Sequence, residues 1–559
     1  MDGWQGKVLR VDLSNRLIKI ESVSLEVCQR YLGGRGLATK VFTEEVNPVI
    51  DSLAEENKII LATGPLTGTG ASAGSICSIV TKSPLTNTIT CGQAKMHFGA
   101  ELKAAGYDIL IIEGNAKSPI LLSIQDENVE ILPADHLWGE TTSKVEDIVR
   151  LAISDPWKAR ETKILSVGPA GERAEPIATV IIDGLPVRNG VGIGAVFGIK
   201  KLKAIIVKGT KDITLAHGEG FINAVSASVE FLKEAESLRE FSELGTHLLL
   251  KPIAKIGALG YENLSKRAPE AIYSLSTEFL GKLWQGDRGC FACPIACLKQ
   301  TELGFFPEIE EFISLGPLCG IINPSATIDA YKLCIEYGLD ANEMGAGVAC
   351  VMELGKDLSF GETDGSLEAI RASGEGDEAG GLLSKGAFYL SRHFEREDVF
   401  MGVKRRSMPP FDPRIIQGIG LQYATCNFGA THLTGFTLIE ELEDPYSIKN
   451  KAILVKRYQD QTAILESIGV CPYVLFGFNL STFINMLNQA TGLDFKEEEI
   501  IKIGEHIYDL EHSFNKNAGI VNEDRLPLRM LSQPINGMVS HLEEMLKEYC
   551  TLRGLPSEE

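Results

Sequence analysis

The sequence lacks long hydrophobic runs and an excess of positive charge. No stretch of its 559 residues approaches 18 consecutive apolar residues, so no membrane-spanning helix is expected. Lys and Arg number 54 against 75 Asp and Glu, and the net charge of −21 argues against nucleic acid and against an anionic membrane as partners. Residues 1–6 are polar and do not open a secretory signal, so we expect a cytoplasmic protein.

Cysteine is sparse and unevenly spaced, which makes a disulfide framework an unsuitable description. Twelve cysteines are scattered over the chain, as is typical of a reducing compartment. A hydrophobic content of 44% and a charged content of 23% are those of an ordinary globular protein. At this length the chain should divide into two to four domains.

Three of the cysteines lie within eight residues, in the run from Cys290 through Cys293 to Cys297. The spacings C-x2-C and C-x3-C let one turn of chain surround a metal centre without ordering a long loop. A zinc ribbon would repeat the C-x2-C pair, and the sequence contains no second pair. The run is more typical of an iron–sulfur cluster whose fourth cysteine comes from a distant segment. A zinc knob or buried free thiols are the alternatives.

Short runs of alternating apolar and polar residues predict that residues 1–208 form a β-rich domain. Ser14-Asn15 predicts a hairpin between the first two strands. Glycine-rich turns at 33–36, 63–70 and 190–194 either cradle phosphates with backbone N–H groups or mark close crossings of the chain. The predicted strands are 7–13, 17–21, 58–62, 77–81, 109–113, 119–124 and 204–208.

From about residue 215 onward the apolar periodicity is that of helices, which makes the fold class α+β. Ile503, Ile507, Leu510 and Phe514 fall on one face of a predicted helix that ends at residues 517–519. The segment 356–381 is rich in Gly, Asp and Glu and is predicted to be a surface loop or weak linker.

Two segments of the helical part echo each other, Ile335–Asp340 and Glu466–Cys471. Both read as three residues, then Gly, an aliphatic residue and a ligand-type residue, Asp or Cys. Such a pattern fits a helix C-cap that turns into a binding loop. Two such loops could hold a pseudo-symmetric ligand from opposite sides, and the second would supply Cys471 as a fourth thiolate. The alternative is a chance similarity between two helix ends.

A further signal comes from eight stretches spread over nearly the whole chain: residues 32–37, 62–68, 80–86, 98–108, 194–205, 290–297, 418–425 and 503–511. In this order they resemble the tungsten-containing aldehyde:ferredoxin oxidoreductase family. Together they make the likeness highly specific.

The resemblance implies an architecture and a set of cofactors. A β-rich N-terminal domain (1–208) would form a base for two mostly helical domains, 209–405 with the three clustered cysteines and 406–559 with His432 and Cys471. The cofactors would be one [4Fe–4S] cluster and a tungstopterin, in which two pyranopterins hold W or Mo between the domains, with Mg²⁺ as an optional component. A homodimer without bridging iron is one allowed oligomeric state.

The resemblance also assigns roles to individual residues. It implies Glu310 and His432 as catalytic residues, for which a solvated carboxylate at a helix start and a satisfied interior histidine are the alternatives. The implied cluster ligands are Cys290, Cys293, Cys297 and Cys471. The implied cofactor-binding residues are Gln93, Asp183, Arg188, Gly192, Gly194, Leu339, Asp340, Glu466 and Val470.

Several positions depart from the family pattern. Basic residues that usually contact the pterin or its phosphates align with Ile76, Pro186, Gly190, Phe428 and Thr434, and the first acidic position of the first loop is Ile335. Arg188 lies close enough to two lost positions to compensate in part. The Glu-x-x-His pairs of iron-bridged dimers read Asp329-x-x-Lys332 and Glu368-x-x-Arg371 here, so we expect no bridging iron.

The activity implied is the two-electron oxidation of an aldehyde to a carboxylic acid, with electrons passed through the cluster to ferredoxin or another electron-transfer subunit. In that reading Glu310 activates the attacking water and His432 hydrogen-bonds the substrate. One alternative is the tungsten subunit of an aromatic acyl-CoA reductase. Another is a cluster-bearing electron-transfer subunit that is poor in pterin, because the lost basic residues predict a labile, altered or absent pterin.

Overall fold

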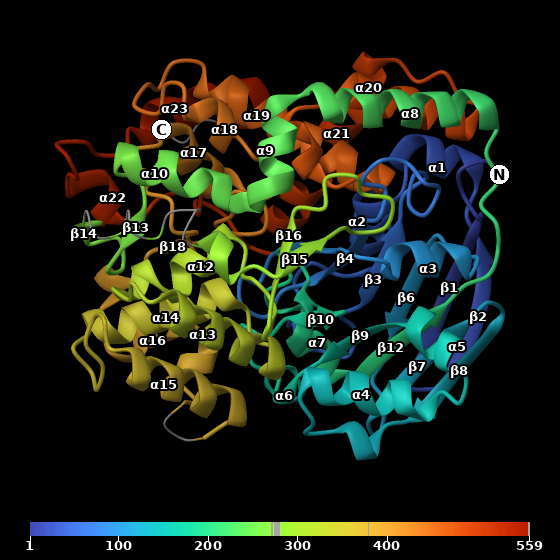
Figure 1. Ribbon diagram of the computed structural model, residues 1–559, viewed down its shortest axis with the longest axis horizontal. Coiled ribbons are helices and arrows are strands. Elements are labelled where there is room, and N and C mark those ends of the chain that lie inside the picture. The colour runs from blue at the N-terminus through green and yellow to red at the C-terminus, as the bar shows by residue number, and fades with distance from the viewer. Residues whose placement is uncertain (270–271, 273–274, 276–279, 378–379, 557–559) are drawn as a thin grey trace.

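The structure, a computed structural model, describes residues 1–556 apart from 270–271, 273–274, 276–279 and 378–379. It confirms the α+β fold, with a β-rich N-terminal region followed by a mostly helical remainder (Figure 1). All seven predicted strands are present, and Asp12 faces Leu17 across the predicted hairpin. Among the described helices, none combines the length and apolarity needed to cross a membrane.

The N-terminal region contains two six-stranded sheets. The first has the order β2 (Leu17–Ser22), β1 (Lys7–Asp12), β6 (Ile109–Glu113), β3 (Ile59–Thr63), β4 (Cys77–Lys82), β5 (Ile89–Ala94). The second has the order β8 (Asn128–Pro133), β7 (Ile120–Gln125), β12 (Leu202–Lys208), β9 (Lys163–Val167), β10 (Val180–Ile182), β11 (Leu185–Pro186).

The two sheets repeat one topology, because strand n of the first corresponds to strand n + 6 of the second. In each sheet the first and last strands of the repeat pair in parallel, β1 with β6 and β7 with β12, and the other pairs are antiparallel. A short helix precedes each last strand, α3 (Phe98–Ala104) in the first sheet and α7 (Ile193–Ile199) in the second. The sequence reading did not detect this internal duplication.

The two sheets share one apolar core that also contains α3 and α7. On β6, Leu110 and Ile112 point into this shared core, whereas Ile109 and Ile111 point to the opposite face. That opposite face is covered by α2 (Gly34–Glu45) and α21 (Glu497–Asn517). Both faces of β3, β4, β5 and β6 are therefore buried, which explains why β3 and β6 are nearly continuous apolar runs. The edge strand β2 is largely exposed.

The helical remainder lies against these sheets in two groups (Figure 1). The group at the lower left contains α12 (Ile309–Leu315), α13 (Pro324–Tyr337), α14 (Ala341–Glu353), α15 (Thr363–Glu375) and α16 (Ala387–His393). The group at the top contains α17 (Gln417–Thr425), α18 (Leu438–Glu441), α19 (Lys451–Ile468), α20 (Leu480–Thr491), α21 and α23 (Leu542–Arg553), with α22 (Leu528–Ser532) at the left edge.

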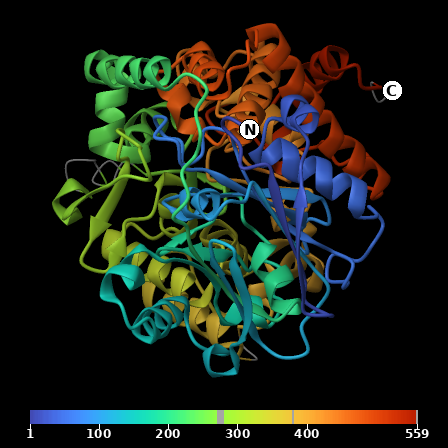
Figure 2. The same cartoon turned by 90° about the vertical axis from the view of Figure 1, so that its right-hand side faces the viewer.

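The stretch that joins the sheets to the helical groups runs across the top of the molecule. Helix α8 (Gly218–Glu234) lies along α20, and α9 (Glu236–Leu244) and α10 (Leu250–Ile256) follow it. Figure 2 shows the C-terminal helices above the strands of the N-terminal region. The predicted helical face of α21 is confirmed, and the helix ends at Asn517, with Gly519 in the left-handed region at φ +85°.

The expectation of a loop across 356–381 is wrong for its central part, which forms α15. Leu367 and Ile370 pack on the main apolar cluster, and α15 contacts α13. Apolar residues three positions apart on one side of the helix outweigh the low helix propensity of the surrounding Gly and Asp.

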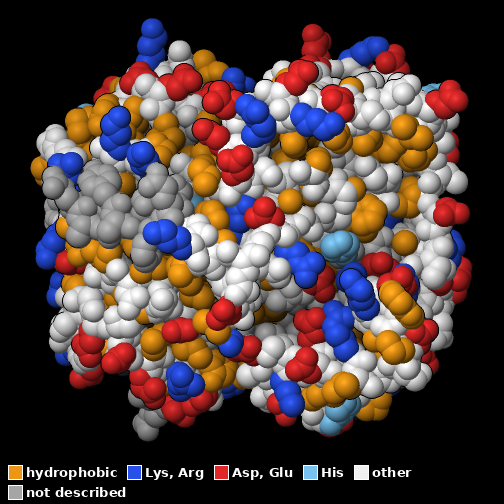
Figure 3. Space-filling view, viewed as in Figure 1, with side chains coloured by type: hydrophobic (Ala, Val, Ile, Leu, Met, Phe, Trp, Pro, Cys, Tyr) orange, Lys and Arg blue, Asp and Glu red, His pale blue; other side chains and the backbone are white. Residues whose placement is uncertain are grey.

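The outer surface agrees with the charge balance of the sequence. On the face in Figure 3, Lys and Arg are interspersed with Asp and Glu and do not form a continuous basic surface.

Candidate active site

The clustered cysteines lie in the closing loop of a small hairpin. Strand β15 (Gly286–Arg288) ends just before Cys290, and β16 (Leu298–Thr301) begins just after Cys297, with Arg288 facing Leu298. Strand β17 (Gly304–Phe305) completes this sheet. Ala292 and Ala296 adopt left-handed backbone angles of φ 51° and 47°, which turn the loop tightly between the cysteines.

The fourth predicted ligand, Cys471, reaches the same place from the C-terminal half. Ala73 joins the two segments: its N–H donates to the carbonyl of Ala292 at 3.3 Å, and its carbonyl accepts from the N–H of Cys471 at 3.1 Å. The structure therefore brings together the three clustered cysteines and the distant one, as the spacing and the internal echo predicted.

The four thiols lie in one another's electrostatic field. Burial first, and then the neighbouring Cys290 and Cys471, raise the pKa of Cys293 to about 12. Burial, Glu308 and the other three thiols raise the pKa of Cys297 well above its usual value. These raised pKa values favour neutral Cys293 and Cys297, and a cationic metal centre would favour their thiolates. Soft sulfur donors from four cysteines fit an iron–sulfur cluster.

In the described part of the chain, no three His, Cys, Asp or Glu side chains converge on a point as ligands of a single ion would. A cubane cluster does not require such convergence, because each of its cysteines binds a different iron. The four thiols supply one sulfur ligand for each of its four irons.

The internal echo of the sequence is a structural repeat. Gly338 ends α13 at φ +71° and Gly469 ends α19 at φ +87°, and the following N–H groups of Leu339 and Val470 donate to Cys334 and Leu465, five residues back in each case. Both loops then lie against the N-terminal sheets. Asp340 N–H donates to Ile177 in the loop before β10, as Cys471 N–H donates to Ala73 in the loop before β4.

A buried cavity lies beside the cysteines, where the two helical groups meet the N-terminal sheets. Six of its lining residues carry a buried nitrogen or oxygen that has no hydrogen-bond partner in the described part of the chain: Arg188, Asn189, Glu311, Asn342, Arg406 and His432. Orphaned buried polar atoms are costly, so this concentration indicates a place for a polar ligand. The lining also contains Lys95, Pro186, Val187, Thr246, Glu308, Ile309, Glu310, Tyr331, Asp340, Ala341, Leu433, Phe436 and Tyr473.

The two predicted catalytic residues face each other in this cavity. Glu310, in the first turn of α12, is 7% exposed, which excludes a solvated carboxylate. His432 Nδ1 lies 3.5 Å from Glu310 Oε2 and makes no hydrogen bond within the described residues. The imidazole packs edge-on against Phe411 and tilted against Phe436, with ring centroids 5.0 and 5.4 Å away.

Burial favours the neutral form of both groups. Burial, and then the neighbouring Glu311, raise the pKa of Glu310 well above its usual value, while Arg406 opposes the shift. Burial, together with the cations Arg188 and Arg406, lowers the pKa of His432 to about 3. The pair therefore combines a carboxyl group that can donate a proton with an imidazole nitrogen that can accept one.

The predicted cofactor-binding residues do not all line one cavity. Arg188 and Asp340 line the cavity, and Gln93 on β5 holds Arg188 through two backbone hydrogen bonds of 2.8 and 3.1 Å. Leu339 and Val470 lie fully buried in the two helix-end loops. Asp183 lines a second cavity with Ile335 on the outer side of the second sheet, where burial raises its pKa to about 6. Tyr331 lines both cavities.

Gly192 lies just before α7 and Gly194 is the second residue of this helix, at a place where two segments of the chain cross closely. Both N–H groups donate to the carbonyl of Ala178, at 2.9 and 3.1 Å. A Cβ on Gly192 would approach Ser83 Oγ to 2.5 Å, and one on Gly194 would approach Thr179 O to 2.5 Å. Close packing accounts for these glycines, and a role in holding a cofactor stays a prediction.

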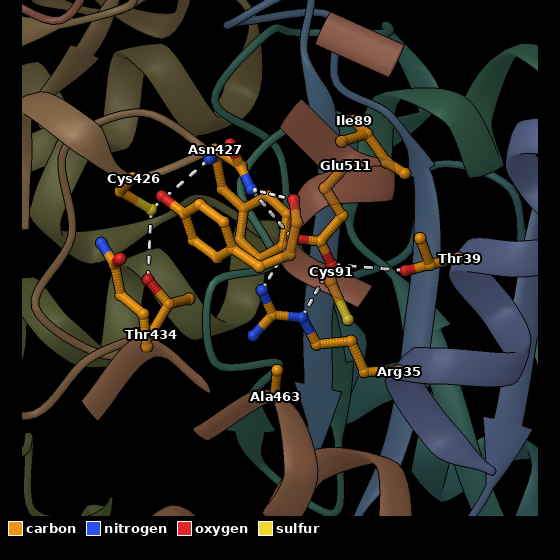
Figure 4. Close-up of polar contacts among 12 residues, drawn as sticks. Arg35, Thr39, Ile89, Cys91, Cys426, Asn427, Thr434, Ala463 and Glu511 are labelled. Atoms are coloured by element: carbon orange, nitrogen blue, oxygen red, sulfur yellow. Dashed lines mark hydrogen bonds and ion pairs between the residues drawn. The ribbon is translucent and has the colours of Figure 1, made fainter. Parts of the chain in front are cut away.

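Glu466, on α19, belongs to a buried ion-pair network that joins α2 to α19 and α21. Arg35 at the start of α2 donates to Glu466 at 3.0 Å and, through two bonds of 2.7 Å, to Glu511 on α21. Figure 4 shows Arg35 and Thr39 pointing toward Glu511. Burial raises the pKa of Glu466 to about 7 against the opposing effect of Arg35.

Three of the positions that lost a basic residue have local contacts of their own. Phe428 lies under the Arg35 guanidinium at 4.9 Å. Thr434 and Cys426 share a hydrogen bond of 3.1 Å (Figure 4). A Cβ on Gly190 would approach Thr179 Oγ1 to 2.6 Å, so this backbone does not admit a larger residue.

Lys95, Asn189 and Arg406 are cavity residues that the sequence reading missed. Arg406 donates to Asn189 Oδ1 at 3.1 Å, and its Nε and Nη1 atoms are among the orphaned ones. In sequence it closes the basic run 404–406, which resembles an ordinary solvated surface. Only tertiary contacts reveal that it is 2% exposed. These donors, with Arg188, fit a ligand that carries phosphates, such as a pterin cofactor.

Four thiols next to a buried cavity with an acid–imidazole pair are typical of a metal-dependent redox enzyme. Comparison with known families makes the class definite. Residues 8–209 match the family model "Aldehyde ferredoxin oxidoreductase, N-terminal domain", and residues 223–558 match "Aldehyde ferredoxin oxidoreductase, domains 2 & 3". The chain belongs to the aldehyde ferredoxin oxidoreductase family of oxidoreductases.

Individual relatives agree over the full length. The chain is 36% identical to the tungsten-containing aldehyde ferredoxin oxidoreductase of Pyrococcus abyssi and 35% identical to that of Pyrococcus furiosus, covering 99% of this chain and 96% of each relative. The WOR-like subunit of an aliphatic sulfonate oxidoreductase from Pyrococcus furiosus is 28% identical and covers 69% of this chain and 67% of its own length.

A solved structure shares the fold. It is the active site complex BamBC of benzoyl coenzyme A reductase with 1,5-dienoyl-CoA, at a TM-score of 0.85 and 19% identity, covering 100% of this chain and 95% of that one.

Proposed function

We propose that this protein oxidises an aldehyde to a carboxylic acid at a tungstopterin and passes the electrons through a [4Fe–4S] cluster to a ferredoxin. The observation that carries the proposal is full-length identity of 34–36% with tungsten-containing aldehyde ferredoxin oxidoreductases. The four gathered thiols and the buried Glu310–His432 pair support it.

The chemistry requires water and releases two protons and two electrons for each aldehyde. When bound, the tungstopterin supplies a two-electron acceptor, and Arg188, Asn189, Asp340, Asn342 and Arg406 are the residues that would hold it in the cavity. Cys290, Cys293, Cys297 and Cys471 would hold the cluster, which accepts electrons one at a time.

Glu310 and His432 would donate and accept the protons of the reaction. The neutral His432 has a free ring nitrogen that can accept a proton from water, and the protonated Glu310 can donate to the substrate oxygen. The opposite division, in which Glu310 is the carboxylate that activates water, requires Arg406 and the bound substrate to stabilise its charge. Apolar surfaces of Phe411 and Phe436 orient the imidazole and help to exclude bulk water.

The test uses protein purified without oxygen from a host supplied with tungstate. Aldehyde-dependent reduction of a viologen dye and of a ferredoxin, with about four irons and one tungsten per chain, is the expected result. Reduction or formation of an aromatic acyl-CoA without aldehyde turnover would instead favour the acyl-CoA reductase, whose solved structure shares the fold. Two zinc atoms and no acid-labile sulfide would end the proposal.

The same preparation tests how firmly the pterin is held. We expect the cluster to survive gel filtration better than the tungstopterin, because Ile76, Pro186, Gly190, Phe428 and Thr434 cannot replace basic donors, each worth about 1.5–3 kcal/mol as a charged hydrogen bond. Arg188 and Arg406 reduce that deficit. Two pterins per tungsten at full occupancy after gel filtration would show that these two arginines suffice.

A further inference from the structure

We infer that Arg188 is the counter-ion of the cluster at Cys471 and that it raises the cluster's reduction potential. The inference rests on the proposed function, because it requires the cluster to be present. It adds a positioning residue that acts on the cluster through its thiolate ligand.

Arg188 is held rigidly between the N-terminal sheets and the cysteine loop. Its backbone N–H and its backbone carbonyl both form hydrogen bonds with the backbone of Gln93 on β5. Its guanidinium lies 4.0 Å above the ring of Tyr473 and donates to Cys471 Sγ through Nη1 at 3.9 Å and Nη2 at 3.8 Å. Two donors from one planar group therefore converge on one sulfur.

Arg188 has no carboxylate partner within 4.0 Å among the described residues. In this it is like Arg406, which donates to Asn189 instead. Lys95 is paired with Glu308 at 2.7 Å, and Arg35 is paired with two glutamates. Arg188 is 6% exposed, and its close polar side-chain contact is the Cys471 thiol. A buried, unpaired cation is expensive. An anionic cluster bound through Cys471 would provide the missing negative charge.

This placement has a consequence for electron transfer. Reduction adds one negative charge to the cluster, so a fixed cation against one of its thiolates stabilises the reduced form more than the oxidised form. Arg188 also lines the cavity in which Glu310 and His432 lie. It therefore stands between the site of aldehyde oxidation and the cluster, where it favours uptake of the first electron.

The experiment is a redox titration of the cluster, followed by electron paramagnetic resonance, in wild-type protein and three variants. Arg188→Met removes the charge at similar length, and Arg188→Lys keeps the charge but loses the two-donor geometry. Arg406→Met is the matched control, because Arg406 is a buried cation of the same cavity without a contact to a cluster cysteine. Protein made without tungstate is titrated as well, which removes the tungsten centre from the comparison.

Arg188→Met should lower the midpoint potential by at least the 59 mV that corresponds to a tenfold change in the one-electron equilibrium. Arg188→Lys should fall between Arg188→Met and wild type, with iron content unchanged. A shift in Arg188→Met no larger than that in Arg406→Met overturns the inference and would assign the guanidinium to an anion in the cavity. Cluster loss in Arg188→Met with retention in Arg188→Lys supports the counter-ion role. Wild-type protein without any cluster would instead refute the proposed function.

Discussion

The loops ending at Asp340 and Cys471 have the same backbone geometry and different chemistry. Each follows a helix that ends at a left-handed glycine, and each donates a hydrogen bond to one of the two N-terminal sheet regions. Asp340 then caps α14 by accepting from Glu343 N–H and lines the cavity, whereas Cys471 joins the other thiols. The duplicated scaffold supplies two equivalent positions, occupied by a carboxylate in one loop and a thiol in the other.

Substitution of Cys471, at the end of the second loop, should have the largest effect. Cys471→Ser removes the fourth thiolate, so most of the cluster iron and acid-labile sulfide should be lost or the cluster converted to a smaller one. Turnover should fall with it. Cys319→Ser and Cys350→Ser are the matched controls, because these cysteines are buried and their raised pKa values include no effect of the four thiols. Full iron and sulfide content in Cys471→Ser would remove this residue from the ligand set.

Substitutions in the cavity pair, Glu310 and His432, should greatly reduce turnover and leave both cofactors bound. Glu310→Gln and His432→Asn keep the shape of the buried pair but remove its proton transfer. Loss of a general acid or base typically costs about 10²–10⁴-fold in rate, so we expect that loss in steady-state turnover. Iron, sulfide and tungsten contents should match wild type. Near-normal turnover in either variant would contradict the role of that residue.

The other loop is tested by Asp340→Asn, which should act on the cavity alone. Asn remains a good N-cap for α14, so the helix is preserved while the carboxylate is lost. If the carboxylate holds the pterin, losing a charged hydrogen bond of about 1.5–3 kcal/mol should weaken retention of tungsten by about 10–100-fold. The measurement is tungsten and pterin content after dialysis, with iron content as the internal control. Equal retention by Asn and Asp would leave Asp340 with a capping role only.

The smallest effect concerns stability next to the same loop. Burial, and then Asp340, raise the pKa of Glu343 from 4.5 to about 7. The folded state therefore binds this proton more tightly than the unfolded chain, and the contribution is fully present below pH 4.5 and lost as the pH rises through 7. Glu343→Gln can still accept from Ser407, whose N–H and hydroxyl each bond Glu343 at 2.8 Å.

The advantage of Glu343→Gln over wild type should grow by about 1–3 kcal/mol in unfolding free energy between about pH 5 and pH 8. Urea denaturation of cofactor-free protein at both pH values measures it. A difference that stays constant over this range would show that Glu343 does not titrate in the fold.

Local sequence patterns predicted those parts of the structure that are determined by residues close together in the chain. The cysteine spacing, the alternation in the strands and the glycine-ended helices are short-range features, and each was found where expected. Helix α15 was missed because local composition disfavoured it, and only packing of Leu367 and Ile370 on α13 and the main cluster stabilises it.

The cavity could be predicted only in part, because its residues come from segments far apart. Glu310, His432, Arg188 and Asp340 were found through the family likeness, and Arg406 was not. A basic run is usually exposed to solvent, and the residues next to Arg406 in sequence give no sign that its side chain is buried. Arg188 and Arg406 reach the cavity through tertiary contacts, and the spacing of residues along the sequence does not reveal such contacts.

The buried ion-pair network at Arg35 has a consequence for biosynthesis. Arg35 belongs to the first turn of α2, yet its partners Glu466 and Glu511 belong to the last quarter of the chain. Because α19 leads directly into Cys471, the fourth thiol is positioned by contacts between an early and a late segment of the chain. We therefore expect the complete set of four thiols to form only after α19 and α21 have been synthesised and have packed against α2.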